Sequence, residues 1–513
     1  MDKFIQSIYQ LLDYENYDQA RKQVRKQLEK EDLDHNLNLI SKLKLYGLLT
    51  DIGSESMNKN DLEESINFYI KNEEKIKKII TVSSYYYNLA NGKQGLCKIF
   101  YLKNPGVHSI SKCREKFQEP IDLYWLAYKN TSEDDNLLDQ ILINLSISLM
   151  KNSRIVEALQ MLDIVLKKNP NFPNALVTRA ENLNYLDLYT NSKVSVALHT
   201  QIYCSYKQCI ENNSVPPNIL VKCQIGLKNA QDKMISYGQT VEDIDKEINI
   251  SKMEYEFHSN YRKFCIDNFL TLNEHSLYCN CLLTAKDQLQ IGISNVVFKS
   301  ELLPRLEILL NRMKSEYAFA RWNYYKSSTE DAFDYDVIFS ELFEDEIIDS
   351  QSETLRASFR ICYGILDKIA LGICKLYGVD GGNMYFERFW EDKNRKDVLE
   401  KQRNIHLNAL ASIACDLNSS RGELKHFKKW RNKIEHNLLI LQDQKSPIND
   451  SFNVLEDKDF ITAVDIKDFR DKTIHLLQIT RAAILSFVYC VRLETITKND
   501  PNTTPSIIIG PKQ

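Results

Sequence analysis

The sequence predicts an all-α protein, with a solenoid of paired helices in its N-terminal half and a helical bundle near its C-terminal end. The chain of 513 residues contains only 15 Gly and 11 Pro, so turn signals are sparse and long helices must dominate. Apolar residues recur at intervals of three and four, which is the period of one face of a helix. With 43% hydrophobic content, a chain of this length can bury the cores of two or three domains.

Charge and targeting signals narrow the classes of function. The formal net charge of −4 excludes a globally basic nucleic-acid coat protein, so any contact with RNA must be a local patch. The chain opens directly into an amphipathic helix, without the charged and apolar regions of a secretory signal, and we expect a cytoplasmic protein. The longest apolar run, Ala482 to Val491, is too short to span a bilayer, and no membrane association is predicted.

The 12 cysteines are scattered, and free buried thiols in a reducing cytosol are their expected state. One local cluster, His275 with Cys279 and Cys281, contains residue types that bind zinc. A C-x-C pattern with no second pair favours ordinary packed cysteines over a zinc site. The sequence therefore predicts neither a metal site nor a cofactor.

Residues 1–235 show a pattern of helical hairpins. Small residues at Ser146 and Ala158 would let two helices approach closely, and Pro170 would stop the second helix. This unit resembles a tetratricopeptide repeat (TPR), and Ala180 falls 34 residues after Ser146, which is the period of that repeat. The resemblance implies a superhelix whose concave face holds a protein or peptide partner or trigger. The pattern is carried by Leu142, Leu145, Ser146, Leu149, Ala158, Leu162, Val165 and Pro170.

The 34-residue period is lost after the hairpins, and a new pattern begins near Glu353. Apolar positions such as Leu355 and Phe359 repeat at three and four and define a long helix that should end near Gly378. Short connections between the helices that follow favour an up-and-down bundle. The predicted regions are a helical connecting region over 236–345, a bundle over 346–498 and a flexible tail over 499–513. The four predicted bundle helices span about 353–377, 397–417, 420–441 and 466–493.

The candidate site lies in a basic stretch of the third predicted bundle helix. Arg431 and His436 bracket four residues, and Asn432 is one helical turn from His436 on the same face. An Arg can direct two N–H donors at a phosphate, and a His titrates near neutral pH and can exchange protons with a ribose hydroxyl or a leaving oxygen. A second pair with the same spacing, Arg421 and His426, begins at a capping box and falls in the first turn of the helix.

This pattern resembles the signature of HEPN-domain ribonucleases, in which four to six residues separate an Arg from a His. The resemblance implies a metal-independent endoribonuclease that cleaves RNA through attack of the ribose 2′-hydroxyl, at a site shared by two copies of the chain in a homodimer. The implied catalytic residues are Arg431, Asn432 and His436. The basic residues that would follow the RNA backbone are Lys425, Lys428, Lys429 and Lys433.

Other features extend the resemblance beyond the motif. The segments Tyr261–Cys265 and Glu316–Arg321 are similar to the helical lead-in of one TPR-linked branch of HEPN proteins. The family's acidic position on the first helix has two candidates here, Asp367 and Glu353, and Glu435 is expected to pair with a neighbouring cation. TPR–HEPN proteins resemble effectors of prokaryotic stress responses or anti-phage defence, so the implied outcome of RNA cleavage is growth arrest.

Two other interpretations remain open from the sequence. The chain can be a non-catalytic scaffold whose repeats bind a partner and whose bundle only dimerises or binds RNA, with Arg431 and Glu435 paired on a solvated helix face. It can also be the toxin of an antidote-regulated nucleotidyltransferase pair. Cleavage of RNA by the purified protein separates the enzyme from the scaffold.

Overall fold

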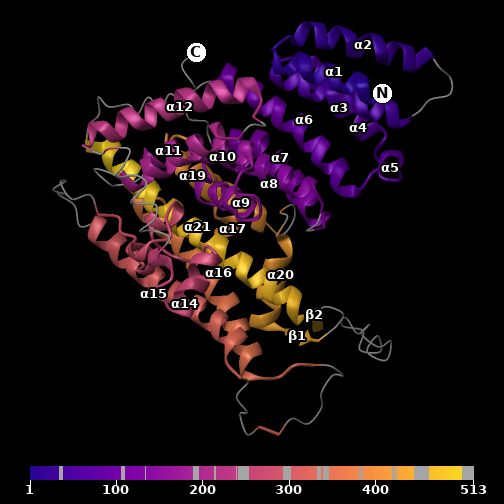
Figure 1. Cartoon of the computed structure of the whole chain (residues 1–513). Helices are drawn as coiled ribbons and strands as arrows, with labels where there is room; N and C mark the ends of the chain where they lie inside the picture. The colour runs from indigo at the N-terminus through magenta and orange to yellow at the C-terminus, as the bar shows by residue number, and fades with distance from the viewer. Residues whose placement is uncertain are drawn as a thin grey trace, which may run out of the picture. The chain divides into compact units, whose positions relative to one another are not determined.

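Helices make up 78% of the residues that the structure describes, which confirms the all-α prediction. Figure 1 shows the computed structural model. Two compact units form, one from Met1–Leu188 with Lys193–Val241 and one from Glu242–Asp500. The structure describes residues 1–33, 39–104, 110–132, 135–188, 196–212, 215–238, 240, 253–292, 302–331, 337–338, 346–380, 382, 385–418, 422, 424–443 and 461–499.

In the N-terminal unit, most helices pack on their neighbours in sequence. Short turns join several of these helices, so the helices on either side of a turn run antiparallel as a hairpin. The helices are α1 (Asp2–Asp13), α2 (Tyr17–Leu33), α3 (Leu39–Glu55), α4 (Lys59–Lys71), α5 (Glu73–Ile76), α6 (Val82–Lys103), α7 (Ile110–Lys129), α8 (Leu137–Lys151), α9 (Ile155–Lys168), α10 (Pro173–Asp187), α11 (Val196–Ile210) and α12 (Pro217–Ser236).

Small residues mark the close helix contacts of this unit. Ser146 of α8 and Ala158 of α9 are fully buried, and α9 ends at Lys168, shortly before Pro170. Helices α4 and α6 also approach closely, because a Cβ atom added at Gly92 would lie 2.8 Å from Cγ1 of Ile66. The hairpins follow the predicted pattern, whereas their assignment to the TPR family remains a prediction.

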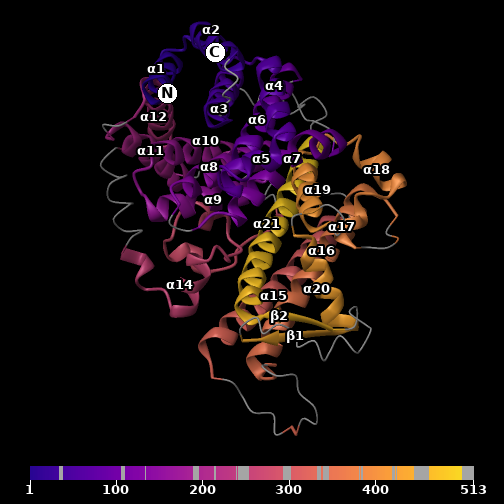
Figure 2. The ribbon, with the colours of Figure 1, turned by 90° about the vertical axis from the view of Figure 1, so that its right-hand side faces the viewer.

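The C-terminal unit is built on long helices. The helices α15, α16 and α21 pack on one another, and α19 packs on α21 (Figure 2). The elements are α14 (Asn260–Asp267), η1 (Glu274–Leu277), η2 (Leu282–Ala285), α15 (Leu302–Thr329), α16 (Ser350–Tyr377), α17 (Phe386–Phe389), α18 (Lys393–Leu399), α19 (Ile405–Leu417), α20 (Lys425–His436), β1 (Leu438–Gln442), β2 (Ile461–Asp465) and α21 (Ile466–Asn499).

Helix α16 has clear start and stop signals. The Asp349 carboxylate accepts a hydrogen bond from the Ser352 N–H at 2.6 Å, which caps the first turn. Gly378 follows the last turn with a φ of 65°, a left-handed conformation that a residue with a Cβ rarely adopts. The helix therefore ends where the sequence predicted.

Two of the predicted bundle helices are wrong in extent. The helix expected over 397–417 is divided into α18 and α19, because Asn404 caps α19 through the His406 N–H and donates from Nδ2 to the Cys490 carbonyl at 2.8 Å. The helix expected over 420–441 ends at His436, and the apolar residues after Asn437 form strand β1. Residues 419–421 lie outside the described residues, so the structure does not describe the predicted capping box or the Arg421 end of the second pair.

Long-range partners explain why β1 is a strand. It pairs in parallel with β2, with Leu438 opposite Ile461, and the Ile347 N–H donates to the Leu441 carbonyl at 2.8 Å. Four of its five residues are buried. Pairing and burial against distant segments override the local helical pattern.

Helix α21 is the one described helix that is long and apolar enough to cross a membrane by length and composition. Within the protein, 83% of the most apolar 18-residue stretch of this helix is buried. Burial of this extent is what the central helix of a bundle shows.

Candidate functional site

The motif helix α20 is fixed by an aromatic cluster. Its Phe427 and Trp430 rings lie 5.7 and 6.1 Å from the ring of Phe359 on α16, and Trp430 also lies 5.3 Å from Phe469 on α21. Such ring pairs stabilise a helix beyond the area that they bury. The cluster therefore holds one face of α20 against the bundle and leaves the opposite face to solvent.

The opposite face carries most of the predicted site. Lys425, Lys429, Asn432 and His436 follow one another at intervals of four, three and four residues, so they lie on one face of the helix. The two lysines and His436 are exposed, and Asn432 is half-buried. An imidazole at this position is accessible to a substrate or to a second protein chain.

Arg431 lies at the edge of this face. Its Nη1 donates to Oδ1 of Asn432 at 3.3 Å, and its guanidinium carbon lies 5.8 Å from the centre of the Tyr385 ring. Among the described residues, no carboxylate forms an ion pair with Arg431, and Glu435 is exposed without the predicted cationic partner. The N–H groups of Arg431 are thus not committed to a carboxylate.

Two of the predicted RNA-binding lysines are placed differently. The Lys428 ammonium forms an ion pair with Glu387 of α17, whose side chain is only 5% exposed. Lys433 is 6% exposed, and its Nζ has no hydrogen-bond partner among the residues that the structure describes. The reason is the helix period, which brings Lys433 onto the buried face three residues after Trp430. Of the four lysines, Lys425 and Lys429 remain available to a nucleic acid.

An acidic residue of α16 adjoins Arg431. Burial raises the pKa of Asp367 to about 6, while the Phe386 N–H, which donates to it at 2.9 Å, and the charge of Arg431 act in the opposite direction. Of the two acidic candidates, Asp367 is thus the one near Arg431, whereas Glu353 forms an ion pair with Arg356.

Tyr363 completes this group and was not predicted. It lies one helical turn before Asp367, and its hydroxyl is buried without a hydrogen-bond partner in the described part of the chain. Burial, with the charge of Glu387, raises the pKa of Tyr363 well above its usual value, while Arg431 lowers it. The i, i+4 spacing from Asp367 is the only signal in the sequence that could have indicated this residue.

The raised pKa of Asp367 gives a prediction for stability. Because the folded state favours the protonated carboxyl, this residue contributes stability below its ordinary pKa of 3.8 that is lost as the pH rises through about 6. Asp367→Asn should therefore be more stable than the wild type at pH 7.5. The free energy of unfolding measured in urea should be higher by on the order of 2 kcal/mol, and this difference should shrink towards pH 4. A difference between the two proteins that does not change with pH would contradict this assignment.

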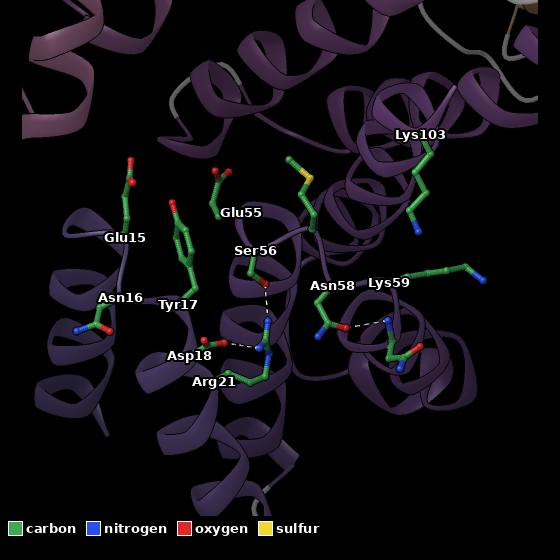
Figure 3. A pocket seen from close by; sticks show the side chains of 12 residues that line it. Glu15, Asn16, Tyr17, Asp18, Arg21, Glu55, Ser56, Asn58, Lys59 and Lys103 are labelled. Carbon is green, nitrogen blue, oxygen red and sulfur yellow. Dashed lines mark hydrogen bonds and ion pairs between the residues drawn. The ribbon is translucent and has the colours of Figure 1, made fainter. Parts of the chain in front are cut away.

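The N-terminal unit contains a separate polar cavity of about 690 Å³ (Figure 3). It lies where the turn before α2 and the turn before α4 meet, and Glu15 and Met57 in these turns have positive φ values of 58° and 55°. Arg21 donates to Ser56 Oγ at 2.6 Å across the floor of the cavity. Acidic and basic side chains are mixed on its walls, so the lining does not indicate one class of ligand.

The elements described above define a helical-bundle domain with a basic helix on its surface. The family model described as LA2681-like HEPN matches residues 297–494, which supports a C-terminal HEPN domain in this chain. HEPN domains are generally ribonucleases, and they commonly dimerise and bind RNA. The match begins before α15 and does not include the N-terminal unit, whose family and boundaries remain predictions. A search of curated proteins finds no match to this chain.

Proposed function

We propose that the C-terminal domain is a metal-independent endoribonuclease and that Arg431, Asn432 and His436 form its catalytic site. The observation that carries the proposal is the placement of the motif. His436 is exposed on the same face as Asn432, and Arg431 beside them has no carboxylate partner among the described residues. A merely structural Arg on a solvated helix would be expected to pair with a nearby acid such as Glu435.

The chemistry of the site follows from these residue types. A base removes the proton of a ribose 2′-hydroxyl, the 2′-oxygen attacks the adjacent phosphorus, and the bond to the 5′-oxygen breaks as an acid protonates that oxygen. The products are a 2′,3′-cyclic phosphate and a 5′-hydroxyl. His436 can serve as base or acid, and Arg431 can stabilise the negative charge on the phosphorane.

One imidazole does not readily supply both proton transfers. A second copy of the motif across a two-fold axis would provide the other His, so we propose that the enzyme acts as a homodimer with a shared site. The exposure of His436 supports this arrangement, because the residue is open to a neighbouring chain. Lys425 and Lys429 would contact the phosphate backbone, and binding should weaken as salt rises.

The N-terminal helices are proposed to regulate this activity by holding a protein or peptide trigger. In that setting the cleavage of RNA would arrest growth, as in anti-phage defence. The requirement for a 2′-hydroxyl would confine the enzyme to RNA.

The test is incubation of the purified full-length protein with total RNA in excess EDTA. We expect cleavage products that end in 2′,3′-cyclic phosphates, no cleavage of DNA, and a dimer in light scattering. Absence of any cleavage from a folded dimer would instead support the scaffold, whose bundle only dimerises or binds RNA. Mapping the cleaved ends would identify the preferred RNA.

A further inference from the structure

A segment of the C-terminal unit has little regular structure and is held by buried arginines. Between α14 and residue 292, the chain forms only the short helices η1 and η2. Arg481 of α21 donates to the Thr271 carbonyl at 2.8 Å, and Arg492 forms an ion pair with Glu274 at 2.7 Å. Arg321 of α15 pairs with Asp287 at 2.7 Å. These contacts fix the segment on either side of the turn between η1 and η2.

That turn brings three metal-binding side chains together. The ligand atoms of His275, Cys279 and Cys281 all lie within 4.8 Å of one another. The Nε2 atom of His275 is 3.1 Å from the Cys281 sulfur, and its Nδ1 atom is 3.1 Å from the Tyr278 hydroxyl. One ring nitrogen thus faces the sulfurs, and the other is held by a hydrogen bond.

We propose that His275, Cys279 and Cys281 bind a zinc ion. Tetrahedral zinc has Zn–S and Zn–N distances of about 2.3 and 2.0–2.1 Å, so its ligand atoms lie roughly 3.3–3.8 Å apart, close to the spacing of this cluster. A zinc-binding His almost always uses its second ring nitrogen for a hydrogen bond, as His275 does with Tyr278. Thiolates with imidazole favour zinc over calcium, magnesium or manganese.

The fourth ligand can come from a side chain outside this segment or from solvent. The carboxylate of Glu254 accepts a hydrogen bond from the Leu282 N–H at 3.0 Å, which places it directly after Cys281. Either this carboxylate or a water would complete the tetrahedron. The sequence pattern favoured packed cysteines because its C-x-C has no second pair, whereas the fold brings the ligand atoms of His275 and both cysteines within 4.8 Å of one another.

The role of the ion would be structural. It would close the loop from His275 to Cys281 and hold the turn between η1 and η2, and binding would contribute to the folding free energy of the unit. This site is separate in sequence from α20, so the inference does not depend on the proposed ribonuclease activity. The EDTA in the cleavage assay can also remove this zinc. Measuring the zinc content of the protein after the same incubation shows whether a loss of cleavage accompanies a loss of this ion.

The test begins with the zinc content of the full-length protein purified under reducing conditions. We expect about one zinc per chain, and a marked loss of zinc in Cys279→Ser, Cys281→Ser and His275→Ala. Cys415→Ser, which changes a half-buried thiol of the same unit outside the cluster, should keep its zinc. Equal zinc content in all four variants would overturn the proposal.

A second measurement uses only the wild type, in case the variants do not fold. Cobalt added to the metal-depleted protein should produce the thiolate-to-cobalt charge-transfer and visible bands of a tetrahedral site. Alkylation mapped by mass spectrometry should show Cys279 and Cys281 protected by zinc and reactive after its removal. A folded wild-type protein that binds neither metal, or that carries a Cys279–Cys281 disulfide in place of zinc, would refute the site.

Discussion

Replacement of His436 by Ala is expected to lower the rate constant for RNA cleavage by about 10²–10⁴-fold, the usual contribution of a general acid or base. The imidazole is exposed at the end of α20, so its removal should leave the packing of the helix unchanged and the variant should unfold at the same temperature as the wild type. The measurement is a single-turnover assay on a labelled RNA in EDTA. Glu435→Ala is the matched control, because Glu435 is the exposed neighbour and should keep nearly full activity.

The same variant tests the shared site. With nine His436→Ala chains for each wild-type chain, about one partner in ten is wild type, so cleavage per wild-type chain should fall roughly ten-fold if both motifs of a dimer are needed. Activity that depends only on the amount of wild-type protein would show that each chain cleaves alone. Full activity of the pure variant would remove His436 from the mechanism.

Local sequence patterns predicted the parts of the fold that local interactions determine. The capped helix α16 ends at Tyr377, as its apolar period and Gly378 indicated. Strand β1 was missed because Leu438 to Leu441 also continue a helical pattern, and only pairing with β2 decides between the two states. The split between α18 and α19 likewise depends on a hydrogen bond from Asn404 to distant Cys490.

In the candidate site too, local spacing predicted some features, and contacts with residues far away in the sequence determined the others. The helix period was sufficient to place Asn432 and His436 on one face of α20. It was not sufficient to separate the lysines, since the pairing of Lys428 depends on Glu387, which lies 41 residues earlier in the sequence. The effect of the Arg431 charge on the pKa of Tyr363 depends on the packing of α16 on α20, which the spacing of residues in the sequence does not predict.

Contacts of this kind also decide which cations of α20 are available for chemistry. Lys428 stabilises the fold, because Lys428→Ala would leave the 5%-exposed carboxylate of Glu387 without its partner, a change that typically costs about 3–5 kcal/mol. Arg431 makes no such ion pair among the described residues. Two neighbouring cations on one helix therefore have different roles, and their substitutions should affect different properties of the protein.

Arg431→Ala is accordingly expected to lower RNA cleavage by about 10²–10³-fold, the usual effect of removing one group that stabilises transition-state charge, while the unfolding temperature changes little. Arg431→Lys keeps the charge but loses the planar pair of N–H donors, so its activity should lie between those of Ala and the wild type. Cleavage rates and thermal unfolding are measured together on both variants and on Lys428→Ala. The ribonuclease assignment requires that Arg431→Ala lose activity while remaining folded. If activity falls only in proportion to the folded fraction, Arg431 is a structural residue, and the phosphate must be held elsewhere.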